Sequence, residues 1–385
     1  MKKVYVAGVG MTNFGKSTKL GRELALEASI LAINDAGIKP KDIEATYVSN
    51  AFGIAENQVH VGPLINSSLG IPEVPSLTIE SACSGSSAAF HEAYVALSSG
   101  IHKVALVVGY EKLSMNPTSE NTRYFAMASD YWFEGLNGVT FPGLYALMAT
   151  AHMKKYGTTE EMLGSVSIKN HRNGYYNPKA HFRKMIDMET YLNSPVVAYP
   201  LKLYDSCPFS DGASALILVN EDFNERKSER VQVLSSVRSG SMAALQDRND
   251  FTGIPGAKIA AEKAFRNSKL SPTDISLAEV HDCFTIAEIM AIEDIGFFKK
   301  GEGGRAELEG ITQYDGKIPI NTSGGLKAKG HPVSATGIAQ ILEIYEQMLY
   351  RVDKNRQVSK PEIGLAHNVG ATGGSVSITI LKRVR

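Results

Sequence analysis

Cysteine and histidine are the residues of this 385-residue chain whose types and spacing could do chemistry. Cys83 lies between a β-prone run, Pro75 to Ile79, and a segment of small residues, Ala88 to Ser98, that is typical of a helix. We therefore expect Cys83 at a strand-to-helix junction, where free N–H groups and the helix dipole favour negative charge. This position is expected to lower the thiol pKa towards the nucleophilic thiolate. The alternative, a buried and inert cysteine, is common for a cysteine considered alone.

An internal repeat points to a second candidate site. Pro40 to Ile43 recurs as Pro272 to Ile275, each time after a predicted helix and before a predicted strand, which indicates two similar halves of one fold. Where the first half has Ser49-Asn50-Ala51, the second has His281-Asp282-Cys283. Because the fold manages without titratable residues in the first half, His281 and Cys283 indicate a function.

Two glycine-rich stretches follow. His331 lies between Gly330 and Pro332 at the entrance of a predicted helix, where a fixed backbone would suit a general base or a structural histidine. The stretch from Ala366 to Ser375 could bring N–H groups to a ligand as an oxyanion site, or form a tight turn. Cys207 precedes a proline in a predicted turn, and we expect it to be structural.

Composition limits the function classes. Lys+Arg and Asp+Glu are equal at 40 each, so no overall charge favours nucleic acid, and no long apolar run predicts a signal peptide or a membrane span. Three widely spaced cysteines predict neither a disulfide framework nor a metal site. The expected location is the reducing cytoplasm.

The elements that must position these residues alternate between predicted strands and helices, which predicts an α/β fold with parallel sheets covered by helices. We expect an N-terminal half over residues 1–225 and a C-terminal half over 226–385, with the boundary in the charged stretch 221–229. From about 112 to 201 the alternation is lost, which predicts an inserted loop domain and a substrate lid. Its basic residues could meet phosphates or form a solvated face: Lys154, Lys155, Lys169, Arg172, Lys179, Arg183 and Lys184.

Four motifs occur in order along the chain: Cys83 at its junction, His281-Asp282-Cys283-Phe284, Gly330-His331-Pro332 before Ala335-Thr336-Gly337, and His367-Asn368-Val369-Gly370. With these motifs the chain resembles the thiolase superfamily from Val4 to Leu381. Within it, the chain is most similar to the sterol-carrier-protein-2-like and archaeal acetyl-CoA C-acetyltransferase (acetoacetyl-CoA thiolase) branch. The resemblance implies two pseudo-duplicated βαβαβ halves in a layered α-β-α-β-α arrangement.

The resemblance also implies roles for individual residues. Cys83 would be the acylated nucleophile, His331 the base that activates it, and Cys283 the acid/base for the α-proton. His281, with His331, would bind the thioester oxygen of the second substrate. The backbone N–H groups of Cys83 and Gly370 would form the other oxyanion hole. Two departures from the family pattern leave acyl-chain length open: Gly85 precedes Ser86 after the nucleophile, and Ser334 replaces a glycine after Gly-His-Pro.

The implied reaction is the reversible condensation of two acetyl-CoA to acetoacetyl-CoA and CoA through an acyl-cysteine. No cofactor would be bound, since coenzyme A is substrate and product. The resemblance further implies a homodimer or dimer of dimers, a place in mevalonate synthesis, and a complex with hydroxymethylglutaryl-CoA synthase and a zinc-ribbon/OB-fold protein. The alternatives are a longer-chain 3-ketoacyl-CoA thiolase of lipid breakdown and a non-catalytic acyl-CoA-binding subunit.

Overall fold

The computed structural model describes residues 1–223 and 230–384, so the predicted boundary at 225/226 lies outside the described residues. The strands of the main sheet are β1 (Val4–Met11), β2 (Ala45–Ser49), β3 (Ser76–Thr78), β4 (Val104–Glu111), β7 (Gly212–Asn220), β8 (Val231–Gly240), β9 (Leu277–Glu279), β10 (Ile363–Gly370) and β11 (Ser375–Arg383). A separate pair comprises β5 (Val196–Ala198) and β6 (Leu201–Lys202).

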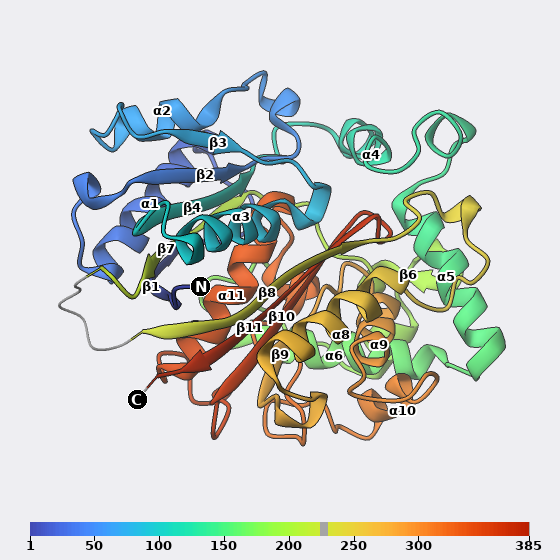
Figure 1. The fold of residues 1–385 in the computed structure, drawn as a ribbon. Coiled ribbons are helices and arrows are strands. Elements are labelled where there is room, and N and C mark those ends of the chain that lie inside the picture. The colour runs from blue at the N-terminus through green and yellow to red at the C-terminus, as the bar shows by residue number, and fades with distance from the viewer. Residues whose placement is uncertain (224–229, 385) are drawn as a thin grey trace.

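The helices lie on the outer faces of this sheet and between its two halves (Figure 1). They are α1 (Gly21–Ala36), α2 (Val61–Ser68), α3 (Gly85–Ser99), α4 (Thr118–Ala126), α5 (Phe141–Tyr156), α6 (Glu160–Tyr175), α7 (Met188–Leu192), α8 (Pro255–Ser268), α9 (Thr285–Asp294), α10 (Gly303–Leu308) and α11 (Thr336–Met348). Within the described part of the chain, none of them is long and apolar enough to cross a membrane.

The predicted internal repeat is visible in the order of the strands. The nine strands follow the order β3-β2-β4-β7-β1-β8-β11-β10-β9, and the halves meet where β1 pairs with β8. Counted outward from this seam, β1, β7, β4 and β2 correspond to β8, β11, β10 and β9. The counterpart of β3 is reduced to one bridge between Ala278 and Ile320. A short 3-10 helix precedes β2 and β9 alike, at Pro40–Asp42 and Pro272–Asp274.

Five layers result, as the resemblance implies. Helix α1 covers the outer face of the first half, and α8 packs on β8 and β11 of the second. Helices α3 and α11 lie between the halves and contact each other, in a core cluster that includes residues of both (Figure 1). Because α3 follows Cys83 and α11 follows His331, the central layer brings both residues to one place.

The expectation of parallel sheets is wrong for much of the sheet. Strands β2, β3 and β4 are parallel and so are β9 and β10, but β7 is antiparallel to β4 and β1, and β11 to β10 and β8. The cause is the connections. A tight turn joins β10 to β11, and the long insertion, rather than a single crossover helix, joins β4 to β7.

The segment between β4 and β7 contains four helices, α4 to α7, where the sequence predicts an inserted loop domain. Helices α5 and α6 begin after Thr140 and Thr159, whose hydroxyl groups accept hydrogen bonds from the N–H groups of Gly143 and Met162. Both are N-cap residues, so the sequence carried a start signal for each helix. Lys169 of α6 is buried and paired with Glu288 and Glu307, which excludes it from the expected phosphate contacts.

Candidate active site

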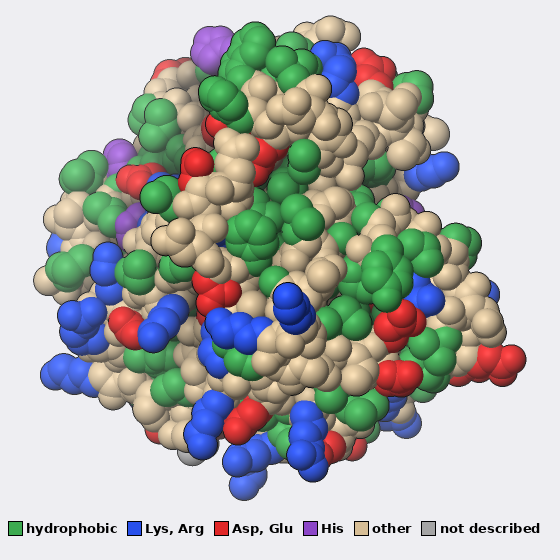
Figure 2. All heavy atoms as spheres, turned by 90° about the vertical axis from the view of Figure 1, so that its right-hand side faces the viewer, with side chains coloured by type: hydrophobic (Ala, Val, Ile, Leu, Met, Phe, Trp, Pro, Cys, Tyr) green, Lys and Arg blue, Asp and Glu red, His purple; other side chains and the backbone are tan. Residues whose placement is uncertain are grey.

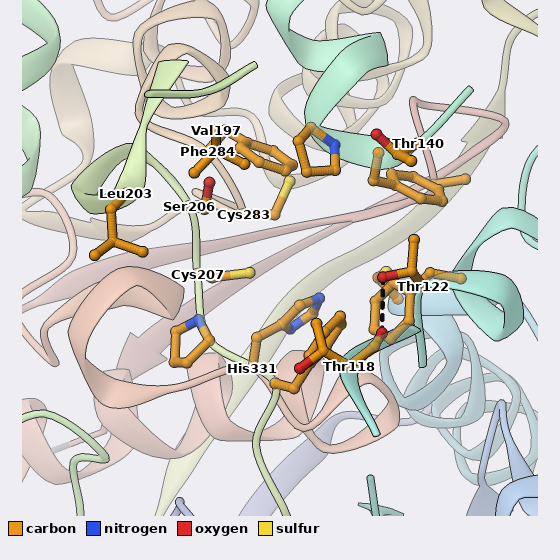
Figure 3. A pocket seen from close by; sticks show the side chains of 17 residues that line it. Thr118, Thr122, Thr140, Val197, Leu203, Ser206, Cys207, Cys283, Phe284 and His331 are labelled. Carbon is orange, nitrogen blue, oxygen red and sulfur yellow. Dashed lines mark hydrogen bonds between the residues drawn. The ribbon is translucent and has the colours of Figure 1, made fainter. Parts of the chain in front are cut away.

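The structure brings the four predicted side chains together. Cys83 lies in a short 3-10 turn (Ala82–Ser84) directly before α3, and His331 precedes α11. His281 and Cys283 follow β9. The Cys83 sulfur and one ring nitrogen each of His281 and His331 all lie within 4.8 Å of one another. Cys83, Cys283 and His331 line one cavity of about 450 Å³ (Figure 3).

Hydrogen bonds fix which nitrogen of His331 carries the proton. The Thr336 hydroxyl donates its proton to the carbonyl oxygen of Pro332 at 3.1 Å, so its oxygen must accept from Nδ1 of His331 at 2.7 Å. Nδ1 is therefore protonated and Nε2 holds a lone pair, which has no partner among the described residues. Burial, with Lys329 nearby, lowers the pKa of His331 to about 3, so the ring is neutral. Nε2 can accept the Cys83 proton.

His281 has the opposite tautomer. Ser87 donates to Oδ1 of Asn368 at 3.0 Å, and the amide nitrogen of Asn368 lies 3.0 Å from Nδ1 of His281 and donates to it. Burial, with His331 and His367 nearby, lowers the pKa of His281 well below its usual value. The proton of the neutral ring is then on Nε2. No group in the described part of the chain accepts a hydrogen bond from this N–H. An unpaired donor in a buried site is explained if a substrate oxygen accepts from it.

The expected low pKa of Cys83 is wrong. The junction with α3 is present, but burial outweighs it and raises the pKa of the Cys83 thiol to about 12, although a hydrogen bond from the Ala371 N–H acts in the opposite direction. Cys83 is therefore a neutral thiol next to a neutral imidazole. A general base must take its proton during attack.

Cys283 is also a thiol at rest, because burial raises its pKa well above the ordinary value. The neighbouring Cys207 was expected to be structural, and its N–H does donate to the carbonyl oxygen of Cys283 at 3.0 Å. Cys207 also lines the cavity, so all three cysteines of the chain face the same space (Figure 3).

The backbone donors near Cys83 differ by one residue from the predicted pair. Gly370 faces the carbonyl oxygen of Ser81 and the side chain of Ser375. Ala371, with a φ of +55°, lines the cavity beside Cys83, and its N–H reaches the thiol. The geometry therefore favours the N–H groups of Cys83 and Ala371 as the pair that a substrate oxygen would meet.

Supporting residues surround these groups, and sequence analysis assigned them no role. Asp282 is buried and accepts from the N–H of Leu326 at 2.7 Å and from the Asn170 side chain at 2.9 Å, which holds the His-Asp-Cys-Phe turn. Thr336 and Asn368, which set the two tautomers, lie inside motifs that the sequence had shown. Only the contacts reveal what they do.

The cavity is mainly apolar, with side chains from the inserted segment and from the turn after β6: Phe125, Phe141, Pro142, Val197, Leu203, Pro208 and Phe209. Figure 2 shows hydrophobic side chains gathered around a hollow in the middle of this face of the molecule, with Lys and Arg mainly below them. Such a lining suits an uncharged arm that carries a reactive group to the thiols.

Cys83, His281 and His331 could also form a metal site, because their ligand atoms are close enough to bind one ion. A metal needs a lone pair from each ligand. The Asn368 contact places a proton on Nε2 of His281, so this nitrogen is a donor and not a ligand.

The fold is of the α/β class, and its candidate site brings two thiols and two imidazoles together. Residues 4–222 match the family described as "Thiolase, N-terminal domain", and residues 238–383 match "Thiolase C-terminal domain-like". The chain belongs to the thiolase family and is an enzyme of the acyltransferase type. The predicted resemblance is confirmed.

Curated relatives agree with this assignment. This chain is 45% identical to the acetyl-CoA acetyltransferase of Methanothermobacter thermautotrophicus and 40% identical to that of Methanocaldococcus jannaschii. Each comparison covers 100% of this chain and 100% of the relative. It is 32% identical to sterol carrier protein 2 of Bos taurus, over 99% of this chain and 72% of that protein.

Solved structures share the fold. The Ltp2-ChsH2(DUF35) aldolase superposes with a TM-score of 0.85 at 24% identity, covering 100% of this chain and 98% of that one. An acetyl-CoA acetyltransferase from Syntrophomonas wolfei superposes with a TM-score of 0.76 at 18% identity, covering 99% of both chains.

Proposed function

We propose that this protein is an acetyl-CoA C-acetyltransferase that reversibly condenses two acetyl-CoA to acetoacetyl-CoA and CoA. One observation carries the proposal. A nucleophilic residue, Cys83, lies beside an imidazole with a free lone pair, in a cavity that also holds a second thiol, Cys283. The archaeal relatives named acetyl-CoA acetyltransferase, similar over their full length, support the choice of acetyl-CoA as substrate.

In the first half-reaction, Nε2 of His331 takes the Cys83 proton and the sulfur attacks the thioester carbon. The developing oxyanion accepts hydrogen bonds from backbone N–H groups at Cys83 and Ala371, or Gly370 as the sequence predicts. The bond to CoA breaks, and the leaving CoA thiolate takes the proton of Cys283. The products are acetyl-Cys83 and free CoA, with Cys283 as a thiolate.

In the second half-reaction, the Cys283 thiolate removes a proton from the methyl group of a second acetyl-CoA. The enolate oxygen accepts from Nε2–H of His281 and from the proton now on Nε2 of His331, which is why the two tautomers must differ at rest. The enolate carbon attacks the acetyl group and the bond to Cys83 breaks. Cys83 recovers its proton from His331. Every proton is returned, so no cofactor is needed beyond coenzyme A as substrate and product.

The test is to incubate the protein with acetyl-CoA and measure free CoA and acetoacetyl-CoA. Thiolysis is then measured with acetoacetyl-CoA and with longer 3-ketoacyl-CoA esters at equal concentrations. We expect the highest kcat/KM for acetoacetyl-CoA. A preference for longer chains would support the lipid-breakdown alternative instead. Binding of acyl-CoA without any turnover would support the binding-subunit alternative.

We also propose that the chain acts in an assembly and supplies acetoacetyl-CoA for mevalonate synthesis in the cytoplasm. The Ltp2-ChsH2(DUF35) aldolase, whose name joins two components, supports the expectation that a protein of this fold pairs with a second protein. The test is co-elution with hydroxymethylglutaryl-CoA synthase and a zinc-ribbon/OB-fold protein encoded in the same genome. Separate elution at micromolar concentrations would contradict the assembly.

A further inference from the structure

Tyr145 of α5 is a buried tyrosine between the two catalytic thiols. It is fully buried, and its ring stacks on Phe284, the residue after Cys283, with centroids 4.7 Å apart. Its hydroxyl group donates to the carbonyl oxygen of Ala371 at 3.1 Å. A tyrosine hydroxyl in such a place needs a polar partner, and here the partner belongs to the Cys83 pocket.

The Ala371 residue connects this hydroxyl to Cys83. The N–H of Ala371 reaches the Cys83 thiol, while its carbonyl oxygen accepts from Tyr145. The Tyr145 ring stacks on Phe284, the neighbour of Cys283 in the chain. Burial raises the pKa of the Cys283 thiol, and the Tyr145 hydroxyl acts in the opposite direction, as a donor to the sulfur does. A continuous series of polar groups therefore runs from one thiol to the other through Ala371 and Tyr145.

We propose that Tyr145 is a further catalytic residue, whose hydroxyl turns from the Ala371 carbonyl oxygen to the Cys283 sulfur when that sulfur becomes a thiolate. This inference rests on the proposed role of Cys283 as acid/base. Tyr145 keeps its proton throughout: Cys283 gives its proton to CoA and later takes one from the substrate, and Tyr145 only changes its acceptor. A single hydroxyl can serve both acceptors because it rotates at little cost.

The chemistry of the site explains why Cys283 needs such a donor. Its thiolate forms in a buried, mainly apolar cavity, where an uncompensated charge is costly. The titratable groups around Cys283 are Cys207, Cys83, Asp282, Tyr145 and Lys327. The Lys327 ammonium donates to the carbonyl oxygen of Ser206 at 2.7 Å and supplies positive charge, while Tyr145 supplies a hydroxyl donor. The guanidinium of Arg248 acts on Tyr145 and makes its hydroxyl a better donor.

The test is Tyr145→Phe, which keeps the stacked ring and removes the hydroxyl. We expect acetylation of Cys83 by acetyl-CoA within about threefold of wild type, because the proton that His331 took from Cys83 can reach the leaving CoA when Cys283 does not release its own. Exchange of the acetyl-CoA methyl protons with D₂O, and thiolysis kcat, should fall by about 10- to 100-fold, the effect of one charge-assisted hydrogen bond. The limb on which the exchange rate rises with pH, where Cys283 becomes a thiolate, should also move to higher pH.

Tyr345→Phe is the matched control. Tyr345 is also fully buried, and its hydroxyl donates to a backbone carbonyl oxygen, that of Ala7, at 3.2 Å, away from the thiols. It should lose similar stability with both half-reactions unchanged. If Tyr145→Phe does not fold, 3-fluorotyrosine at position 145 keeps the hydroxyl as a stronger donor, and exchange should not slow.

The outcomes separate this inference from the proposed function. Unchanged exchange in Tyr145→Phe, or equal losses in acetylation and exchange, would overturn the role of Tyr145. If wild type itself never acetylates Cys83, the proposed function fails instead. Cys283→Ala gives the largest expected loss. This variant should still be acetylated at Cys83 and should show no exchange of the acetyl-CoA methyl protons.

Discussion

The two histidines beside Cys83 differ in which nitrogen carries the proton, and uncharged neighbours set that difference. The Thr336 hydroxyl fixes His331 as an acceptor, and the Asn368 amide fixes His281 as a donor. In the resting site, thiols and imidazoles are neutral. A buried site avoids separated charges until the substrate brings the groups that need them.

Replacing Thr336 by valine should therefore slow acetylation of Cys83. Without the hydroxyl, nothing holds the proton on Nδ1 of His331. We expect an acetylation rate about 10- to 100-fold lower, less than the roughly 10²- to 10⁴-fold of a whole positioned base, because the imidazole itself remains. Acetylation is followed by mass spectrometry after mixing with acetyl-CoA. Thr46→Val is the control, because the Thr46 hydroxyl is buried and has no partner within the described chain. Equal acetylation rates in the two variants would contradict the role of Thr336.

The lowered pKa of His367 should make the free energy of unfolding depend on pH. Burial lowers its pKa from 6.5 to about 3. The unfolded chain therefore binds this proton first, so the stability is fully present above pH 6.5 and is lost as the pH falls towards 3. Urea unfolding of His367→Asn should show a shallower fall in this range than wild type, by up to about 1.4 kcal/mol per pH unit. Parallel curves for the two proteins would contradict the depressed pKa.

At the scale of elements, the site residues lie at strand ends and helix starts. One carboxylate, that of Glu111, links the two halves of the fold at this point. Glu111 ends β4 and accepts from the N–H of Phe52 at 3.0 Å and from the N–H of Ser334 at 3.3 Å. The first N–H follows β2 and the second lies in the turn after His331. The loops that carry the site are therefore tied together at one buried point.

The turn that holds His331 needs a glycine at position 330. Its φ is +108°, outside the range that other residues adopt readily, and an added Cβ would lie 2.8 Å from the Ser210 hydroxyl. Gly330→Ala should cost about 1–3 kcal/mol of unfolding free energy and most of the thiolysis activity. Gly37→Ala, at a φ of +71° with open space around it, should cost about 1 kcal/mol and keep the activity. Full activity in Gly330→Ala would show that the turn does not position His331.

Sequence analysis predicted the elements whose residues follow a simple period or a turn signal. The repeated stretches at Pro40 and Pro272 lie between a helix and a strand as predicted, each as a short 3-10 helix, and the junction before α3 is present as predicted. Strand direction was missed because a connection as long as the one between β4 and β7 permits either direction, so the sequence pattern of each strand does not reveal it. The helices of the inserted segment were missed because α5 and α6 are buried on more than one face and show little amphipathic pattern.

The sequence predicted the site's residues better than their states. Cys83, Cys283, His281 and His331 lie together, as four motifs indicated. The pKa of Cys83 could not be predicted, because burial depends on side chains from distant segments and here outweighs the helix junction. Tyr145 carried no signal, since it lies in a helix of the insertion far along the chain from both thiols.

At the scale of the whole molecule, one edge of the sheet bears on the predicted oligomer. Strand β3 pairs with β2 on one side and has no partner strand on the other within the described chain. Leu77 of β3 is 53% exposed. An open edge with an exposed leucine is a surface that a second copy can pair with.

Leu77→Lys should therefore weaken a homo-oligomer, because a charged side chain on an edge strand opposes pairing. Light scattering after size-exclusion chromatography should give a dimer or tetramer for wild type and a smaller species for the variant. Leu308→Lys is the control, since Leu308 in α10 is 50% exposed and distant from β3. An unchanged mass for Leu77→Lys would place the interface elsewhere.

The most direct test of the central claim is mass spectrometry of wild type, Cys83→Ala and Cys283→Ala after incubation with acetyl-CoA, alongside thiolysis of acetoacetyl-CoA. We expect an acetyl adduct on Cys83 in wild type and in Cys283→Ala, turnover only in wild type, and neither adduct nor turnover in Cys83→Ala. Normal turnover by Cys283→Ala would contradict the acid/base role of Cys283. Absence of an adduct in wild type would contradict the account as a whole.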